Sequence, residues 1–123
     1  MDDDDEEAIN CKVEILGEAG VGKTSIITRF VNDTFDNEIR SSTGVSYTGK
    51  KMKFKDFKNK VINFEIWDTA GQEIYRSLNK NMYTDAAIAL LIYDITNENS
   101  FTEIQNYWYK QLKENAPKDI SKF

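Results

Sequence analysis

The stretch NCKVEILGEAGVGKTSIITRFV, residues 10–31, places a strand-like run, a glycine-rich turn and a helix-like run in direct succession. Apolar residues alternate before the turn, which predicts a strand, and recur at helical spacing after it, which predicts a helix. The turn 17–22 reads GEAGVG and continues into Lys23 and Thr24, which completes the Walker A pattern GxxxxGK[ST]. This pattern, between a strand and a helix, predicts a phosphate-binding loop.

Each part of the loop has a physical role in holding a phosphate chain. The glycines let successive backbone N–H groups turn inward and form a nest for phosphate oxygens. The helix that begins near Lys23 adds the positive end of its dipole. Lys23 is expected to reach the β- and γ-phosphates, and the Thr24 hydroxyl is a hard oxygen ligand of the kind that Mg²⁺ prefers. The nucleotide-binding residues predicted from this segment are Glu18, Ala19, Gly20, Val21, Gly22, Lys23, Thr24 and Ser25.

The rest of the chain predicts an α/β fold. Two strand-like runs, 45–54 and 60–67, are separated by polar residues and predict an antiparallel hairpin. The nearly unbroken apolar run 86–92 predicts a central parallel strand. Together with the Walker A segment, this order predicts a three-layer P-loop NTPase fold with a mostly parallel sheet and one antiparallel hairpin strand. Ligands on such sheets bind at the carboxyl ends of the strands.

A last helix is predicted over 100–115. Ser100 is its expected N-cap, with Glu103 three residues on, and Pro117 is expected to end it. Its apolar face is predicted to consist of Phe101, Ile104, Trp108 and Leu112.

Composition and charge fit one ordinary domain of 123 residues. Residues 2–7 are six consecutive acids, and without them the 21 acidic residues fall to 15, against 16 basic ones. We expect residues 1–8 to be a disordered acidic tail, with an acidic docking tail as the alternative. The absence of a basic stripe argues against a nucleic-acid partner. The single cysteine, Cys11, excludes an intrachain disulfide and is expected to be a small buried thiol.

A second motif follows the predicted hairpin. Residues 67–73 read WDTAGQE and match the switch II signature of Ras-like small GTPases, and residues 93–101, YDITNENSF, resemble the corresponding stretch of the Rab family. The chain is therefore similar to the Rab family of Ras-like small GTPases, in particular its endocytic branch, from about residue 10 to residue 120. The two motifs, at matching spacing, make this resemblance specific.

The resemblance implies a GTP-binding molecular switch that hydrolyses GTP to GDP with Mg²⁺ and regulates vesicle traffic. Asp68 would hold Mg²⁺ through water, and the Gly71 N–H would contact the γ-phosphate. Gln72 would orient the attacking water. The expected catalytic residues are therefore Gln72 and, through its contact with the β- and γ-phosphates, Lys23.

The switch I segment departs from the family, which has Thr-Ile-Gly where this chain has Ser42-Thr43-Gly44. Ser42 can supply the Mg²⁺-binding hydroxyl, and Thr43 replaces it only if the loop shifts by one residue. Phe35 stands where the family places an aromatic ring against the guanine base; a role in the core is the alternative.

The expected partners are guanine nucleotide and, through the two switches, effectors, a GTPase-activating protein and an exchange factor. Tyr47 and Trp67 fit the aromatic patch that Rab proteins present to effectors, whose third aromatic is Met82 here, with Tyr83 beside it. A buried Trp67 without a partner is the alternative.

The Asn-Lys-x-Asp and Ser-Ala-Lys motifs that read guanine in the family do not occur in these 123 residues, nor do the prenylated cysteines. We therefore interpret residues 9–123 as the N-terminal portion of a small GTPase G domain, with the edge of the 86–92 strand exposed. The N-terminus does not resemble a signal peptide and no apolar run reaches ~18 residues, so we expect a cytoplasmic chain, with membrane association only through a missing lipidated tail.

Two other readings of the function stay open at the level of sequence. The chain is alternatively a truncated, non-catalytic module that binds nucleotide without guanine specificity or presents its surface to effectors. An adenine-nucleotide enzyme such as a small kinase is a third possibility, although the 68–72 segment belongs to the GTPase signature.

Overall fold

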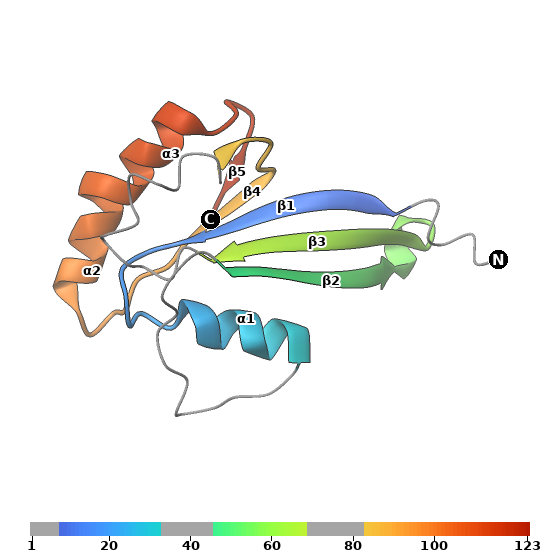
Figure 1. Cartoon of the computed structure of the whole chain (residues 1–123), viewed down its shortest axis with the longest axis horizontal. Coiled ribbons are helices and arrows are strands. Elements are labelled where there is room, and N and C mark those ends of the chain that lie inside the picture. The colour runs from blue at the N-terminus through green and yellow to red at the C-terminus, as the bar shows by residue number, and fades with distance from the viewer. Residues whose placement is uncertain (1–7, 33–45, 69–82) are drawn as a thin grey trace.

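The computed structural model describes residues 8–32, 46–68 and 83–123 (Figure 1). Its elements are β1 (Ile9–Leu16), α1 (Lys23–Asn32), β2 (Ser46–Phe54), a 3₁₀ turn η2 (Lys55–Phe57), β3 (Lys60–Asp68), β4 (Ile88–Leu91), α2 (Glu98–Glu103), a π-helical turn η5 (Ile104–Trp108), α3 (Tyr109–Asn115) and β5 (Ser121–Lys122).

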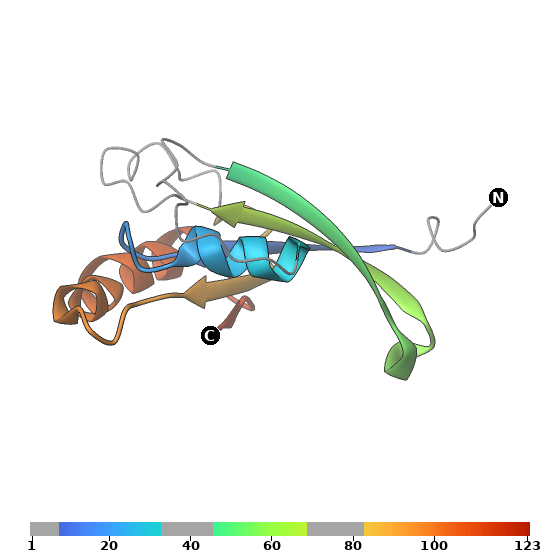
Figure 2. The same ribbon diagram turned by 90° about the horizontal axis from the view of Figure 1, so that it is seen from below.

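The five strands form one sheet in the order β2-β3-β1-β4-β5. β2 runs antiparallel to β3, and every other neighbouring pair is parallel. The predicted α/β class, with one antiparallel hairpin strand in a mostly parallel sheet, is confirmed. The β2–β3 hairpin extends beyond α1 as a twisted ribbon (Figure 2), as expected for a strongly twisted strand pair.

Alternation along β1 divides the core into two clusters, one on each face of the sheet. Successive residues of a strand point to opposite faces, so Ile15 and Leu16 enter different clusters. The α1 face contains Val13, Ile15, Ile27 and Ile66, and the α2–α3 face contains Leu16, Ala89, Ile104, Trp108 and Leu112 with their neighbours. Helix, sheet and helix therefore form three layers (Figure 1).

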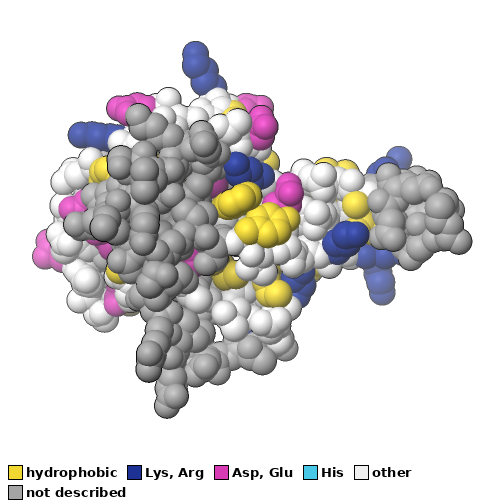
Figure 3. Space-filling view, in the orientation of Figure 1, with side chains coloured by type: hydrophobic (Ala, Val, Ile, Leu, Met, Phe, Trp, Pro, Cys, Tyr) yellow, Lys and Arg dark blue, Asp and Glu magenta, His cyan; other side chains and the backbone are white. Residues whose placement is uncertain are grey.

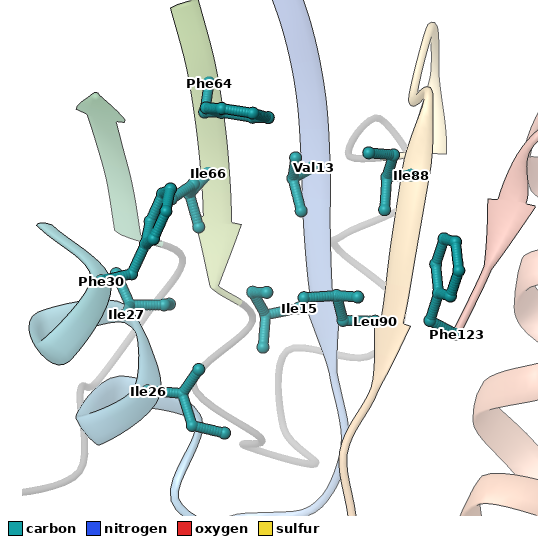
Figure 4. A pocket seen from close by; sticks show the side chains of 10 residues that line it. All are labelled: Val13, Ile15, Ile26, Ile27, Phe30, Phe64, Ile66, Ile88, Leu90 and Phe123. Carbon is teal, nitrogen blue, oxygen red and sulfur yellow. The ribbon is translucent and has the colours of Figure 1, made fainter. Parts of the chain in front are cut away.

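An open apolar groove of about 370 Å³ lies on the α1 face (Figure 4). Side chains of α1, β1, β3 and β4 line it, together with Phe123 (Figure 4). Ile26 and Phe30 of α1 remain 44% and 37% exposed there. A parallel sheet is normally covered on both faces, and among the described elements only α1 packs on this one.

The outer edge of β4 is paired, so the predicted exposed edge at 86–92 is wrong. The regular strand is shorter, Ile88–Leu91, and β5 lies parallel beside it, with Ile88 opposite Ser121 and Ala89 opposite Lys122. The chain after Pro117 turns back toward the sheet and supplies this short strand. Local alternation cannot reveal such a return because two residues carry no period.

The last helical segment begins at Glu98, and its N-cap is Asn97 rather than the predicted Ser100. The Asn97 side chain accepts a hydrogen bond from the Ser100 backbone N–H at 3.4 Å. Ser100 is fully buried, and its hydroxyl accepts from the Asp94 N–H at 2.9 Å. Both side chains are good caps, and burial of Ser100 beneath the Asp94 turn decides between them.

The two ends of the predicted apolar face behave differently. Leu112 is buried as expected, but Phe101 is 42% exposed and packs against Tyr93 at 4.8 Å between ring centroids.

The predicted helix end is confirmed: the helix stops at Asn115, and Ala116, which precedes Pro117, is extended, as steric conflict with a proline ring requires. Within the described residues, no helix has the length and apolar character of a membrane span.

The Cys11 thiol is half-buried on the α1 face, in partial agreement with the expected buried thiol. Burial and, secondarily, the Glu65 charge raise its pKa.

Candidate phosphate-binding site

The sheet brings the glycine-rich turn and the end of β3 to one place. β1 is central and pairs with both β3 and β4, with Ile15 opposite Asp68 and Leu16 opposite Leu91. The strands are parallel, so their carboxyl ends share one edge of the sheet, which is where ligands bind in such folds. The turn that leaves β1 therefore begins beside Asp68.

The first glycine of the turn is required by its surroundings. Gly17 has φ 150°, and a Cβ there would collide with the carbonyl oxygen of Ile92. That close approach follows from the hydrogen bond that the Ile92 N–H donates to the Leu16 carbonyl at 2.8 Å. Gly20 and Gly22 have φ 81° and 102°, in the left-handed region that glycine adopts without strain. The turn can thus expose successive N–H groups to one anion.

Lys23 begins α1 and is only 4% exposed. Its Nζ donates a hydrogen bond to the Glu18 carbonyl oxygen at 2.7 Å, which closes the loop on itself. Burial lowers the pKa of the Lys23 ammonium, and the charges of Asp68 and Glu18 oppose that effect. A buried cation beside exposed backbone donors makes the loop a favourable place for an anion, since burial of a charge is costly unless it is paired.

The Thr24 hydroxyl and the Asp68 carboxylate are in direct contact. Thr24 Oγ1 donates to Asp68 Oδ2 at 2.9 Å, and Asp68 is 2% exposed. Both groups offer oxygen atoms, which Mg²⁺ prefers as ligands, and their contact brings these two predicted metal-binding side chains together. Within the described residues, no group of three or more His, Cys, Asp or Glu side chains gathers as a metal site. The third predicted ligand, Ser42, lies outside them.

The other predicted site residues divide into two groups. Ala19 and Gly20 are exposed at the tip of the turn, while Glu18, Val21, Gly22 and Ser25 are half-buried around it. Phe35, Ser42, Gly71 and Gln72 lie outside the described residues, as does Thr43, the alternative to Ser42.

One side-chain contact of the loop was not predicted from the sequence. The Trp108 indole Nε1 donates to Glu18 Oε2 at 2.7 Å, across 90 positions of sequence. Trp108 was predicted to be buried on a helix face, and it is 2% exposed. A buried indole N–H usually finds an acceptor, so the sequence indicated that a partner exists without identifying Glu18.

The two aromatic residues that the resemblance assigns to effector binding lie side by side on the hairpin. Tyr47 and Trp67 are opposite each other in the β2–β3 register, with ring centroids 5.1 Å apart in an edge arrangement. Tyr47 is 51% exposed, and hydrophobic side chains are visible on the surface over β2 and β3 (Figure 3). Tyr83 is instead buried in the core on the α2–α3 face, so it does not extend this pair at the surface.

The strand, the glycine-rich turn and the helix, with a buried lysine and a hydroxyl–carboxylate pair, define a P-loop domain of the α/β class. The family model described as "Ras family" matches residues 12–123. The chain belongs to the Ras family.

Rab proteins are among the relatives of this chain. The chain is 43% identical over 109 residues to the Ras-related protein Rab-22A of Homo sapiens. The matched region covers 89% of this chain and 54% of that protein. The chain is 44% identical over 109 residues to Rab-31 of Homo sapiens, with the same coverage. It is 40% identical over 111 residues to Rab-13 of Canis lupus familiaris, covering 90% of this chain and 53% of that protein. The chain thus spans about half the length of these curated relatives.

Proposed function

We propose that the chain is a guanine-nucleotide switch of the Rab type, which binds GTP or GDP with Mg²⁺, hydrolyses GTP and regulates vesicle traffic. The observation that carries the proposal is the buried Lys23 ammonium inside the glycine-rich turn, next to the contact between Thr24 and Asp68. Membership of the Ras family and similarity to Rab proteins support it.

The residues of this chain divide the work of binding and hydrolysis. Backbone N–H groups of the turn 17–22 bind the phosphate oxygens, and Lys23 neutralises part of their charge. Thr24, Asp68 and Ser42 hold Mg²⁺, which supplies charge neutralisation at the β- and γ-phosphates when bound. Gln72 orients the attacking water, and Gly71 donates its N–H to the γ-phosphate.

The surfaces for other proteins are assigned to the two switch segments and to the Tyr47–Trp67 pair. The exposed Tyr47 and the half-buried Trp67 lie beside the cation of Lys12, whose Nζ is 5.4 Å from the centroid of the Trp67 ring. This surface suits a partner with apolar and acidic side chains. We assign effectors to this surface, and a GTPase-activating protein and an exchange factor to the switches.

Competition between nucleotides tests the proposal. We expect a fluorescent GTP analogue to bind in the presence of Mg²⁺ and to be displaced by GTP more readily than by ATP. A preference for ATP, or no binding, would contradict the proposal. Equal displacement by both would favour the second candidate, a phosphate-binding module without base selectivity, because these 123 residues contain no Asn-Lys-x-Asp motif.

Gln72→Leu is expected to retain nucleotide binding and to abolish GTP turnover, because leucine cannot orient water for attack. Single-turnover hydrolysis and nucleotide affinity are the two measurements. Gln105→Leu makes the same change at an exposed position of η5 and should leave both unchanged. Turnover at the unaltered rate in Gln72→Leu would refute the role of Gln72.

Asp68→Asn is expected to weaken Mg²⁺-dependent nucleotide binding about tenfold or more, because a neutral amide is a poor ligand for a hard cation. Affinity measured with Mg²⁺ and with a chelator separates this effect from phosphate binding, which Asp68 does not contact in the proposal. The matched control is Asp85→Asn, at an exposed position with φ 61°, a backbone conformation that asparagine tolerates. An unchanged Mg²⁺ response in Asp68→Asn would remove Asp68 from the metal site.

A further inference from the structure

Glu18 is held at both its backbone and its side chain. Its carbonyl oxygen accepts a hydrogen bond from Lys23 Nζ at 2.7 Å, and its carboxylate oxygen Oε2 accepts one from Trp108 Nε1 at 2.7 Å. The first contact lies within the phosphate loop. The second ties the loop to the buried core on the α2–α3 face, because Trp108 belongs to that cluster.

The indole reaches Glu18 from an irregular part of its helix. Residues Ile104–Trp108 form a π-helical turn, in which the Tyr109 N–H donates to the Ile104 carbonyl. A π turn contains one residue more than an α turn and therefore rotates the side chains that follow by roughly 100°. Both Ile104 and Trp108 remain buried across this turn. The irregularity thus fixes which side chain faces the loop, at a place in the helix that directly contacts the proposed site.

The charge of Glu18 makes its position matter for a phosphate ligand. Burial lowers the pKa of the Lys23 ammonium, whereas the negative charges of Asp68 and, to a smaller extent, Glu18 raise it. The Glu18 carboxylate is therefore close enough to act on Lys23 electrostatically. A carboxylate turned toward that ammonium would compete with phosphate for the same cation. A hydrogen bond from a neutral donor to a carboxylate is charge-assisted and among the stronger ones, so the indole can hold the carboxylate in its present direction.

We propose that Trp108 is a positioning residue for the phosphate loop, which keeps the Glu18 carboxylate away from Lys23 and so leaves the Lys23 ammonium available to phosphate. The inference rests on the proposed function, since it concerns the same site. It assigns a role to the side chain of Glu18 and to the π-helical turn, both separate from the backbone groups that bind phosphate.

The test compares Trp108→Phe in two backgrounds. Phenylalanine keeps the ring in the core and removes the N–H donor. In the otherwise unaltered chain we expect nucleotide affinity to fall about tenfold, with the loss mainly in a faster dissociation rate. In the Glu18→Gln background, where no carboxylate can compete for Lys23, the same Trp108→Phe change should have little further effect. Thermal unfolding of each variant records how much stability the smaller ring removes.

A purely structural role for Trp108 predicts a different pattern, in which affinity falls equally in both backgrounds, and that result would overturn the inference. Tyr109→Phe removes a hydroxyl from the exposed face of the same helix and serves as the control. If the unaltered chain binds no nucleotide, the proposed function and this inference fail together. If it binds nucleotide and Trp108→Phe binds equally well, only this inference fails.

A spectroscopic measurement does not depend on the folding of Trp108→Phe. The Trp108 indole N–H resonance, distinguished from that of Trp67 by a Trp67→Phe variant, should shift on Glu18→Gln and on addition of a non-hydrolysable GTP analogue. An indole resonance indifferent to both changes would also overturn the inference.

Discussion

Glu14→Leu is expected to raise the free energy of unfolding at pH 7 by about 3 kcal/mol. Glu14 is 0% exposed, on the face of β1 that carries Leu16 and opposite Ala89 in the sheet register. Neither carboxylate oxygen has a hydrogen-bond partner among the described residues. A buried polar group without a partner is among the costliest features of a folded chain, and leucine has a similar volume without that cost.

The pH dependence of stability identifies the cause. Burial raises the pKa of Glu14 from 4.5 to about 8, and the Lys12 charge opposes the shift only in part. Between these two values the folded chain binds one proton more than the unfolded chain, so stability decreases as pH rises, by about 1.4 kcal/mol per pH unit. Below pH 4.5 both states carry the proton, and above about pH 8 neither does, so the contribution of Glu14 is then constant.

Chemical denaturation between pH 5 and pH 8 measures this slope directly. Glu14→Leu should remove it, and so should Glu14→Gln, which stays neutral but retains a buried amide and therefore gains less stability. Glu65→Leu provides the same chemical change on the neighbouring strand β3 at a half-buried position, and it should keep the slope. If the stability of the unaltered chain does not change with pH, burial does not raise the pKa of Glu14 in the folded chain, and the prediction is wrong.

Glu14 also illustrates what a strand pattern does not reveal. Its alternation with apolar neighbours correctly predicted a strand, but period-two alternation places Lys12 and Glu14 on what reads as a polar face. The α2–α3 helix covers part of that face. Lys12 and Glu14 are only two residues apart on the strand. The Lys12 Nζ is at the surface and donates to the Thr84 carbonyl, whereas Glu14 is fully buried. Only the tertiary arrangement sets this difference.

The features of the candidate site that the sequence could indicate are local, or belong to a motif with a fixed chemical purpose. The glycines of the turn are adjacent in sequence, and their backbone requirements depend on immediate neighbours. The contact between Thr24 and Asp68 spans 44 positions, yet the Walker A motif and the family resemblance had assigned both side chains to one magnesium site and so indicated that they lie close together. The hydrogen bond from Trp108 to Glu18 belongs to no such motif. Its geometry depends on a π-helical turn that no residue pattern predicted.

The same distinction applies to the fold. Strands β1 to β4 and the first helix were placed within one or two residues, since each is marked by alternation, by helical spacing or by a continuous apolar run. β5 consists of two residues and the Asn97 cap depends on burial of Ser100, so both follow from packing rather than from propensity.

Lys23→Met is expected to weaken nucleotide binding about a hundredfold or more while leaving the chain at least as stable as before. The Lys23 ammonium is the buried cation of the loop, and its removal eliminates the charge that phosphate would meet. Methionine keeps most of the apolar stem. Because burial already lowers the pKa of Lys23, the folded chain gains no stability from the charge that methionine would remove.

Opposite responses of affinity and stability distinguish this role from a structural one. Lys50→Met is the matched control, because Lys50 Nζ also donates to backbone carbonyls of α1, those of Phe30 at 2.6 Å and Val31 at 3.3 Å, at the other end of the helix. A cation at that end interacts favourably with the helix dipole, so Lys50→Met should lower stability and leave affinity unchanged. Titration with a fluorescent GTP analogue and chemical denaturation of both variants give the four values required. Equal affinity of Lys23→Met and the unaltered chain would show that the phosphates do not bind in the turn 17–22. The rest of the proposed site, which is built around that turn, would then also be wrong.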